Sequence, residues 1–150
     1  MLEKLSLMGR APQVITERLI LRPPKMSDWE QWAELRRESR SFLVPWEPLW
    51  GPDSLSKASY RARLRRIARD VRDDHGQAFF LFRRDSGDLV GGITLGNIRR
   101  GVAQTGTIGY WTGEPHSRKG YMFEALCGLM PFLFHEFSLR RIEAACLPSN

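Results

Sequence analysis

The stretch that decides the fold is TGTIGYWTGEPHSRKGYMFEAL, residues Thr105–Leu126. A strand-like segment, Thr107–Thr112, leads through a turn-rich link into a helix-compatible run that begins near Gly120. This order suits phosphate binding, because the first amide groups of a helix have no intrahelical partner and a glycine lets an anion approach the backbone. Arg118 and Lys119 are expected to add positive charge at the same place.

The same loop is compatible with a simpler interpretation. An ordinary turn between a strand and a helix, with Ser117 as the helix cap and two solvated cations, would have this composition too. The remainder of the chain has to decide between the two.

Three further stretches accompany the loop: TERLILRPPKMSDWEQW from Thr16, LVGGITLGNI from Leu89 and RRIEAACLPSN from Arg140. Together with the loop they resemble the GNAT N-acetyltransferases, and within these the ribosomal-protein-alanine N-acetyltransferases. The resemblance covers roughly Thr16–Asn150. It implies an α/β (α+β) fold, with a mixed, mostly antiparallel twisted sheet flanked by helices, and acetyl-CoA as co-substrate.

The chain departs from the family pattern in two places. The family's pyrophosphate loop begins with Gln or Arg and ends with Gly or Ala, where this chain has Ser117 and Met122. Cofactor affinity is therefore expected to be lower, although the backbone donors remain. In the family, the position of Asn150 is followed by a helix and two strands, so residues 1–150 are expected to be a single GNAT domain that is C-terminally incomplete on its acceptor side.

Bulk composition is that of an ordinary globular domain. Hydrophobic residues make up 42% of the 150 residues and charged residues 27%, which allows one real core. A net charge of +6 and a pI near 9.9 favour acidic partners such as a ribosome surface, an acidic peptide or a polyanionic cofactor, or are simply those of a basic domain. No specific DNA binding is expected.

Only two cysteines occur, Cys127 and Cys146, without the spacing of a metal site. No signal peptide or long apolar span is evident, so we expect a cytoplasmic, reduced protein with no metal and no membrane partner.

Periodicity and turn signals predict the elements in order. Met1–Gln13 reads as a loose leader. The first half is predicted to contain a strand over Arg18–Arg22, a helix from a Ser27 cap to about Ser39 and a helical pattern over Ser54–Asp74. The second half is predicted to contain a hairpin of Gln77–Arg84 with Leu89–Arg99, a strand over about Gln104–Thr112, a helix to about Glu136 and a strand over Arg141–Leu147. The apolar stripe of the helix that ends near Glu136 is predicted to consist of Met122, Phe123, Leu126, Met130, Leu133 and Phe137. The arginines of the second helix are a solvated face or a contact for RNA phosphate.

The segment Phe42–Pro52 carries two tryptophans and three prolines and is predicted to be irregular. Trp46 and Trp50 could form a wall for an acceptor peptide, with Glu47 attracting its protonated amine. Alternatively, the loop is packed and Glu47 is merely solvated.

The resemblance also implies how the cofactor would bind. If the strands over 104–112 and 141–147 separate through a bulge near Ile108–Tyr110, their unpaired backbone groups would bind the pantetheine arm as an added strand, and an amide near Tyr110 would stabilise the oxyanion. The candidate cofactor-binding residues are Ile108, Gly109, Tyr110, Trp111, Ser117, Arg118, Lys119, Gly120, Tyr121, Met122 and Asn150. The candidate catalytic residues are Glu47, as a base through water, with Tyr110 and Asn150 as positioning groups.

Glu124, early in the helix after the loop, is expected to be a structural acid favoured by the helix dipole rather than a base. With a base so weakly supplied, a protein N-terminus is the better acceptor, since its pKa of about 7.7 to 8.0 lies well below the value of about 10.4 for lysine. A metabolite amine remains an alternative acceptor, and a non-catalytic basic module that binds a ribosomal protein or RNA remains an alternative function.

Overall fold

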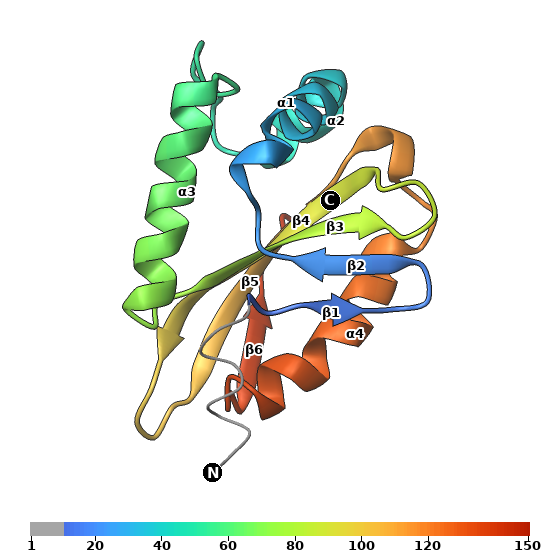
Figure 1. Ribbon diagram of the computed structural model, residues 1–150. Helices are drawn as coiled ribbons and strands as arrows, with labels where there is room; N and C mark the ends of the chain where they lie inside the picture. The colour runs from blue at the N-terminus through green and yellow to red at the C-terminus, as the bar shows by residue number, and fades with distance from the viewer. Residues whose placement is uncertain (1–10) are drawn as a thin grey trace.

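A single curled sheet organises the chain in the computed structural model, which describes residues 11–150 (Figure 1). Its strands follow the chain order: β1 (Val14–Ile15), β2 (Leu19–Arg22), β3 (Gln77–Arg83), β4 (Leu89–Arg99), β5 (Thr105–Thr112) and β6 (Arg141–Ala144). All neighbours are antiparallel except β5 and β6, which are parallel. The mixed, mostly antiparallel sheet predicted from the sequence is therefore confirmed.

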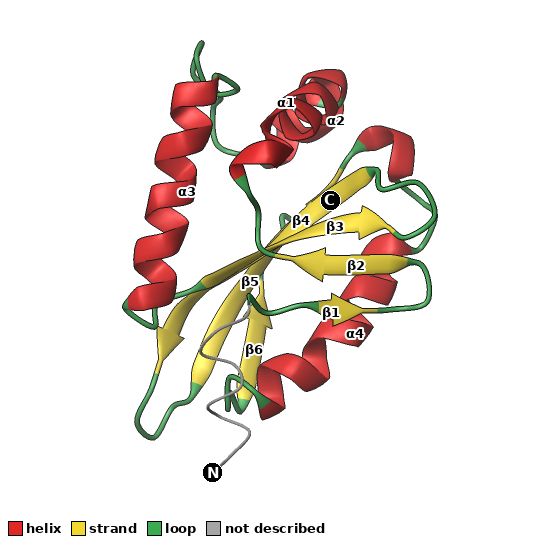
Figure 2. Cartoon of the chain, in the orientation of Figure 1, coloured by secondary structure: helices red, strands yellow, loops and turns green. Residues whose placement is uncertain are grey.

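Helices cover both faces of the sheet (Figure 2). They are α1 (Trp29–Glu38), α2 (Arg40–Leu43), α3 (Lys57–Arg72) and α4 (Tyr121–His135), with short 3-10 turns η1 (Met26–Asp28), η2 (Val44–Trp46) and η3 (Glu114–His116). Helices α1 to α3 lie on one side and α4 crosses the other. Within the described residues, no helix is long and apolar enough to cross a bilayer.

The run of apolar residues in β3 explains why both faces are covered. Phe79 and Leu81 are buried in the core under α4, whereas Phe80 and Phe82 belong to the core formed with α1 and α3. Side chains of a strand alternate between faces, so a strand that is apolar at every position needs cover on both.

Two expectations about helix ends are wrong. The first turn is held by Asp28 and not by Ser27: the Asp28 carboxylate accepts the amide of Lys25 at 2.8 Å and two hydrogen bonds from Arg22 at 2.8 Å. The buried Asp28 thus ties β2 to the start of α1. The segment predicted to be irregular from Phe42 contains the end of helix α2 and the whole of η2, and only the residues after Trp46 lack regular structure as far as α3.

The apolar face of α4 differs by one position from the predicted stripe. The buried residues of the helix are Tyr121, Ala125, Leu129 and Leu133, at a spacing of four. Phe123, predicted to lie in the stripe, is 75% exposed. Of the other predicted stripe residues, Leu133 is fully buried as predicted, and the rest pack at the edge of the core: Met122, Leu126, Met130 and Phe137. Because α4 is apolar almost all round, hydrophobicity alone did not show which side faces the sheet.

The other elements lie where the sequence placed them. The helix predicted within 54–74 is α3, capped by the Ser56 side chain, which accepts the Ser59 amide at 3.1 Å. The hairpin and the strand over 104–112 are β3, β4 and β5 within one residue at their ends. The last strand ends earlier than predicted, at Ala144. Of the predicted leader, residues 1–10 lie outside the described part of the chain, and β1, which follows it, was not predicted.

Candidate active site

The loop between β5 and α4 presents backbone donors. Gly120 stands immediately before the helix in the left-handed region, with φ of 78°, and Arg118 is also left-handed, with φ of 59°. Within residues 11–150 the amides of Tyr121, Met122 and Phe123 have no hydrogen-bond acceptor. Three free amides in the first turn of a 15-residue helix are donors of the kind that bind anions in other proteins.

Ser117 is not the helix cap, so the simpler interpretation of this loop is wrong on that point. Its hydroxyl donates to the carbonyl of Glu114 at 2.8 Å and so closes the turn η3. The capping position belongs to Gly120, whose positive φ explains why a glycine is required there.

An arginine from the other end of the chain braces the loop. Arg18 donates to the carbonyl of Lys119 at 3.0 Å and stacks over the ring of Tyr121 at 4.4 Å. Its Nε lies 2.6 Å from the carboxylate of Glu124, which also accepts the Thr16 hydroxyl at 2.7 Å. Partial burial would raise the pKa of Glu124, but these hydrogen bonds outweigh it and hold the pKa below its usual value. Glu124 is thus a structural acid, as predicted, although its partners and not the helix dipole account for its place.

His116 lies beside this loop with its ring near Tyr121. Its Nδ1 is buried and has no partner among the described residues. Burial, and secondly the charge of Lys119, lower the pKa of His116 and so favour the neutral ring.

The outer edge of β5 is open next to the loop. The β5–β6 ladder ends at the pair Ile108 and Ala144, so Gly109–Thr112 pair only with β4. The two strands do separate where the sequence analysis expected, but they separate because β6 ends and not through a bulge in β5. An extended ligand can use such an edge as it would use a neighbouring strand.

The far end of the site carries an anchored carboxylate. Glu47 accepts hydrogen bonds from Arg36 and, at 2.8 Å, from Trp50, both on Oε2. Glu47 is therefore half-buried and ion-paired and not merely solvated, whereas its predicted role toward an acceptor amine stays a prediction. Trp46, 41% exposed, stands beside it.

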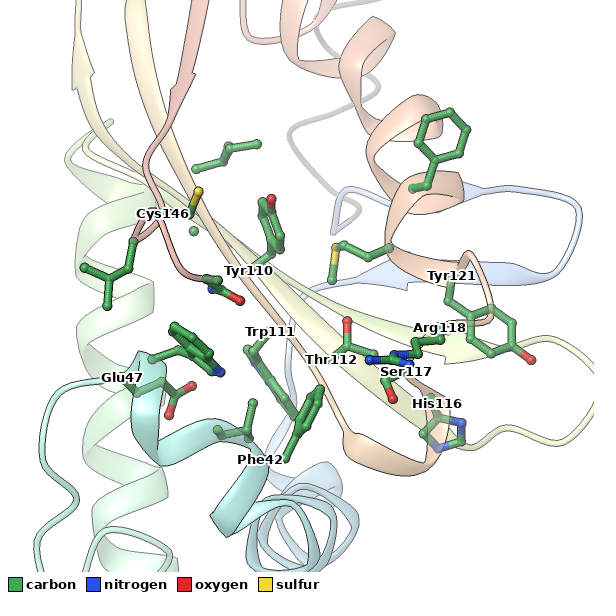
Figure 3. A pocket seen from close by; sticks show the side chains of 18 of the residues that line it. Phe42, Glu47, Tyr110, Trp111, Thr112, His116, Ser117, Arg118, Tyr121 and Cys146 are labelled. Carbon is green, nitrogen blue, oxygen red and sulfur yellow. The ribbon is translucent and has the colours of Figure 1, made fainter.

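These parts line one cavity of about 880 Å³ (Figure 3). Figure 3 shows Ser117, Arg118 and His116 at one end and Glu47 and Cys146 at the other, with Tyr110 and Trp111 between them. Of the residues predicted for the site, the cavity is lined by Glu47, Ile108, Gly109, Tyr110, Trp111, Ser117, Arg118, Gly120, Tyr121, Met122 and Asn150. Lys119 does not line the cavity. Its side chain is exposed, and its backbone carbonyl accepts a hydrogen bond from Arg18.

Sequence reasoning missed several members of the site. Phe42, Leu43, Cys146 and Leu147 line the cavity, and Arg18 supports its loop. Arg18 belongs to the stretch that begins at Thr16, which resembles the family. No local sequence pattern, however, indicates that this stretch contacts the loop before α4. Cys127 and Cys146 are both free and exposed, and residues 11–150 contain no cluster of side chains that could hold a metal.

The site fits a nucleotide thioester. The free amides of α4 would receive a pyrophosphate, and the open edge of β5 is suited to the amide-containing arm that follows it. The sheet, the separating strands and this loop together agree with the acetyltransferase expected from the sequence.

Comparison with known proteins identifies the class. Residues 18–150 match the family described as the acetyltransferase (GNAT) domain, and the chain belongs to that family. It is an N-acetyltransferase domain of a family whose members use acetyl-CoA as co-substrate.

Individual relatives narrow the comparison. The chain is 31% identical to the probable N-acetyltransferase YjcK of Bacillus subtilis, over 88% of this chain and 73% of that protein. It is 30% identical to the [ribosomal protein uS5]-alanine N-acetyltransferase of Escherichia coli, over 92% of this chain and 71% of that protein. Among solved structures, RimJ of Mycobacterium smegmatis in complex with CoA-disulfide superposes with a TM-score of 0.86 at 28% identity, covering 95% of this chain and 71% of that one.

Proposed function

We propose that this domain transfers the acetyl group of acetyl-CoA to the N-terminal α-amine of a protein, with a ribosomal protein as the first candidate. The observation that carries the proposal is the single cavity that joins the amides of α4 to the anchored carboxylate of Glu47. The similarity to an enzyme named for acetylating a ribosomal-protein alanine supports the choice of acceptor.

In this proposal the co-substrate lies along β5. Ser117, Arg118, Gly120, Tyr121 and Met122 surround the pyrophosphate, which accepts hydrogen bonds from the free amides. The pantetheine arm pairs with the edge formed by Ile108–Trp111, and an amide near Tyr110 stabilises the oxyanion. Lys119 contributes charge from outside the cavity, and Asn150 positions the thioester end.

The amine enters from the side of Glu47 and Trp46. Both hydrogen bonds to Glu47 fall on Oε2, so Oε1 has no partner among the described residues and is free to orient the amine directly or through water. The amine lone pair forms the new N–C bond, the C–S bond breaks, the proton lost by nitrogen passes to solvent through Glu47, and the thiolate takes a proton from solvent.

The acceptor follows from proton chemistry. A protein N-terminus, with a pKa of about 7.7 to 8.0, has a sizeable neutral fraction at pH 7, whereas lysine, near 10.4, has very little. A lining with one ion-paired carboxylate and no buried base beside it therefore suits a protein N-terminus better than a lysine.

The proposal is tested with a peptide that begins with Ala and contains an internal Lys. Incubation with acetyl-CoA and tandem mass spectrometry should place the acetyl group on the α-amine only, and the same peptide with a blocked N-terminus should stay unmodified. Faster turnover of small amines than of the peptide would replace the protein acceptor with a metabolite.

The non-catalytic alternative draws on α3, where Arg61, Arg65, Arg66, Arg69 and Arg72 are exposed. RNA binding that falls steeply with salt, combined with no acetyl transfer to any amine, would favour it.

A further inference from the structure

A second, smaller pocket lies on the other side of the Arg36–Glu47 pair. It has a volume of about 260 Å³ and is formed by α1, the segment 49–55 and α3. Its cationic lining consists of Arg36, Arg63 and Arg66, and no carboxylate lines it. Only Arg36 has an anionic partner, Glu47, so two of the three positive charges are not neutralised by the chain.

Two buried donors in this pocket have no acceptor among residues 11–150. They are Nε1 of Trp32, in a side chain only 4% exposed, and Nε of Arg63. A buried polar group without a partner is costly, and buried groups in folded proteins are nearly always paired. Both donors belong to residues that line the same pocket, whose only side-chain acceptors are the hydroxyls of Ser54 and Ser59.

The surroundings make the deficit electrostatic as well. The pKa of Arg63 is lowered, first by burial and then by the nearby charges of Arg36 and Arg66. A water molecule could accept a hydrogen bond from Arg63, but it would not offset the repulsion among the guanidinium groups. A negatively charged acceptor does both.

The size of the pocket limits the ligand. A volume of about 260 Å³ holds one charged group and not a nucleotide. The hydroxyls of Ser54 and Ser59, which also line it, add short-range donors. We infer that the pocket formed by Trp32, Arg63 and Arg66 is a binding site for a small oxyanion, a carboxylate or a phosphate group.

This site is separate from the acetyl-transfer cavity but borders it. Arg36 stacks over Trp50 of the second pocket at 4.6 Å and over Trp111 of the first at 4.8 Å, and its partner Glu47 lines the first. An oxyanion carried by the acceptor chain, such as the carboxylate of an acidic side chain, could therefore bind here. Free inorganic phosphate is the other source of the same chemistry.

The test measures phosphate binding without requiring turnover. Tryptophan fluorescence of the wild-type chain is titrated with inorganic phosphate at constant ionic strength set by chloride, and the response is expected to saturate in the millimolar range or below. Arg66→Gln should weaken phosphate binding by about tenfold or more, because it removes a charge-assisted hydrogen bond. The matched control is Arg65→Gln on the same helix, an exposed arginine outside the pocket, which should change the affinity less than about twofold.

A second variant separates binding from folding. Phosphate that binds the folded chain should raise its Tm, and Arg63→Met should abolish this rise. Without phosphate, the Tm of Arg63→Met should stay close to wild type, because the guanidinium that it removes is buried beside two like charges. Absence of a saturable phosphate response in the wild type, or equal effects of Arg66→Gln and Arg65→Gln, would overturn the inference.

A competition experiment between phosphate and peptides identifies the source of the oxyanion. A peptide beginning with Ala and containing Glu should displace phosphate, and its Gln counterpart should not, if the acceptor supplies the carboxylate. Phosphate binding that neither peptide displaces assigns the site to free phosphate. Because this readout uses no acetyl-CoA, it succeeds or fails independently of the proposed transferase activity.

Discussion

Arg18 shows how far the site reaches at the scale of single residues. It fixes the loop through the carbonyl of Lys119, the ring of Tyr121 and the carboxylate of Glu124, all distant in the sequence. The residue is 44% exposed at its side chain, so its role is to position the loop and not to fill the core. Replacing it should affect the cavity before it affects the fold.

The Glu124 carboxylate offers a pH-dependent test of this bracing. Because its pKa is lowered in the folded state, its contribution to stability is present above its ordinary pKa of 4.5 and is lost as pH falls through the folded value. Glu124→Gln should therefore lower the free energy of unfolding by about 1 kcal/mol at pH 7, with a difference that shrinks below about pH 4.5.

Urea unfolding from pH 3 to 8 measures that difference. Glu136→Gln, an exposed acid just after α4, is the matched control and should match wild type throughout. A Glu124→Gln deficit that is as large at pH 3 as at pH 7 would contradict the ion-pair account.

Glu47 belongs to the same scale. Glu47→Gln keeps the size of the side chain and an acceptor for Trp50 but removes the charge that orients the amine. We expect kcat/KM for the Ala-starting peptide to fall about tenfold or more, while acetyl-CoA affinity changes little. Glu34→Gln, an exposed acid on α1, should leave both quantities unchanged. An equal fall in both variants would show that overall charge, and not this carboxylate, matters.

At the scale of elements, β4 and β5 must approach closely beneath the cavity. A Cβ on Gly91 would meet the carbonyl oxygen of Trp111. Gly91→Ala should therefore lower the free energy of unfolding by about 1 to 3 kcal/mol and weaken acetyl-CoA binding, because Trp111 lines the cavity. At Gly96, on the same strand, a Cβ meets nothing within 4 Å, so Gly96→Ala should stay within about 0.5 kcal/mol of wild type. Denaturant unfolding compares the two, and equal stabilities would show that the strands have room to separate.

The elements also show what the sequence alone could predict. Local periodicity was sufficient for α3 and for β3 to β5, because helical and strand patterns repeat within each segment. It failed at the cap of α1, where Ser27 satisfied the usual pattern but Asp28 has Arg22, from the preceding strand, as its partner. It also missed β1, whose two residues are too few to show a period.

The candidate site likewise has parts that the sequence could predict and parts that it could not. The loop from Ser117 to Met122 could be found because its donors come from consecutive residues, and the likeness to a known family supplied the edge of β5. The bracing by Arg18 and the pairing of Glu47 with Arg36 and Trp50 could not, since neither contact leaves a signal in local spacing. The second pocket joins α1 to α3 and is likewise invisible before the helices are packed.

At the scale of the whole molecule, the cavity is produced by the parting of two strands in one sheet. The loop between β5 and α4 lies at the end of the cavity proposed to bind the pyrophosphate, and α2 with η2 forms the wall at the acceptor end (Figures 1 and 3). The net charge of +6 favours polyanionic ligands at long range. Acetyl-CoA binding is thus expected to depend on one glycine at the start of α4.

Calorimetric titration with acetyl-CoA tests that claim most directly. The wild-type chain should bind at one site, and Gly120→Asp should bind roughly a hundredfold more weakly or not at all, because a carboxylate would face the pyrophosphate. Gly87→Asp is the matched control: it introduces the same charge at a glycine with nearly the same φ, 77°, in open space outside the cavity, and should bind as wild type does. Undiminished affinity in Gly120→Asp, or no binding by the wild type, would contradict the account.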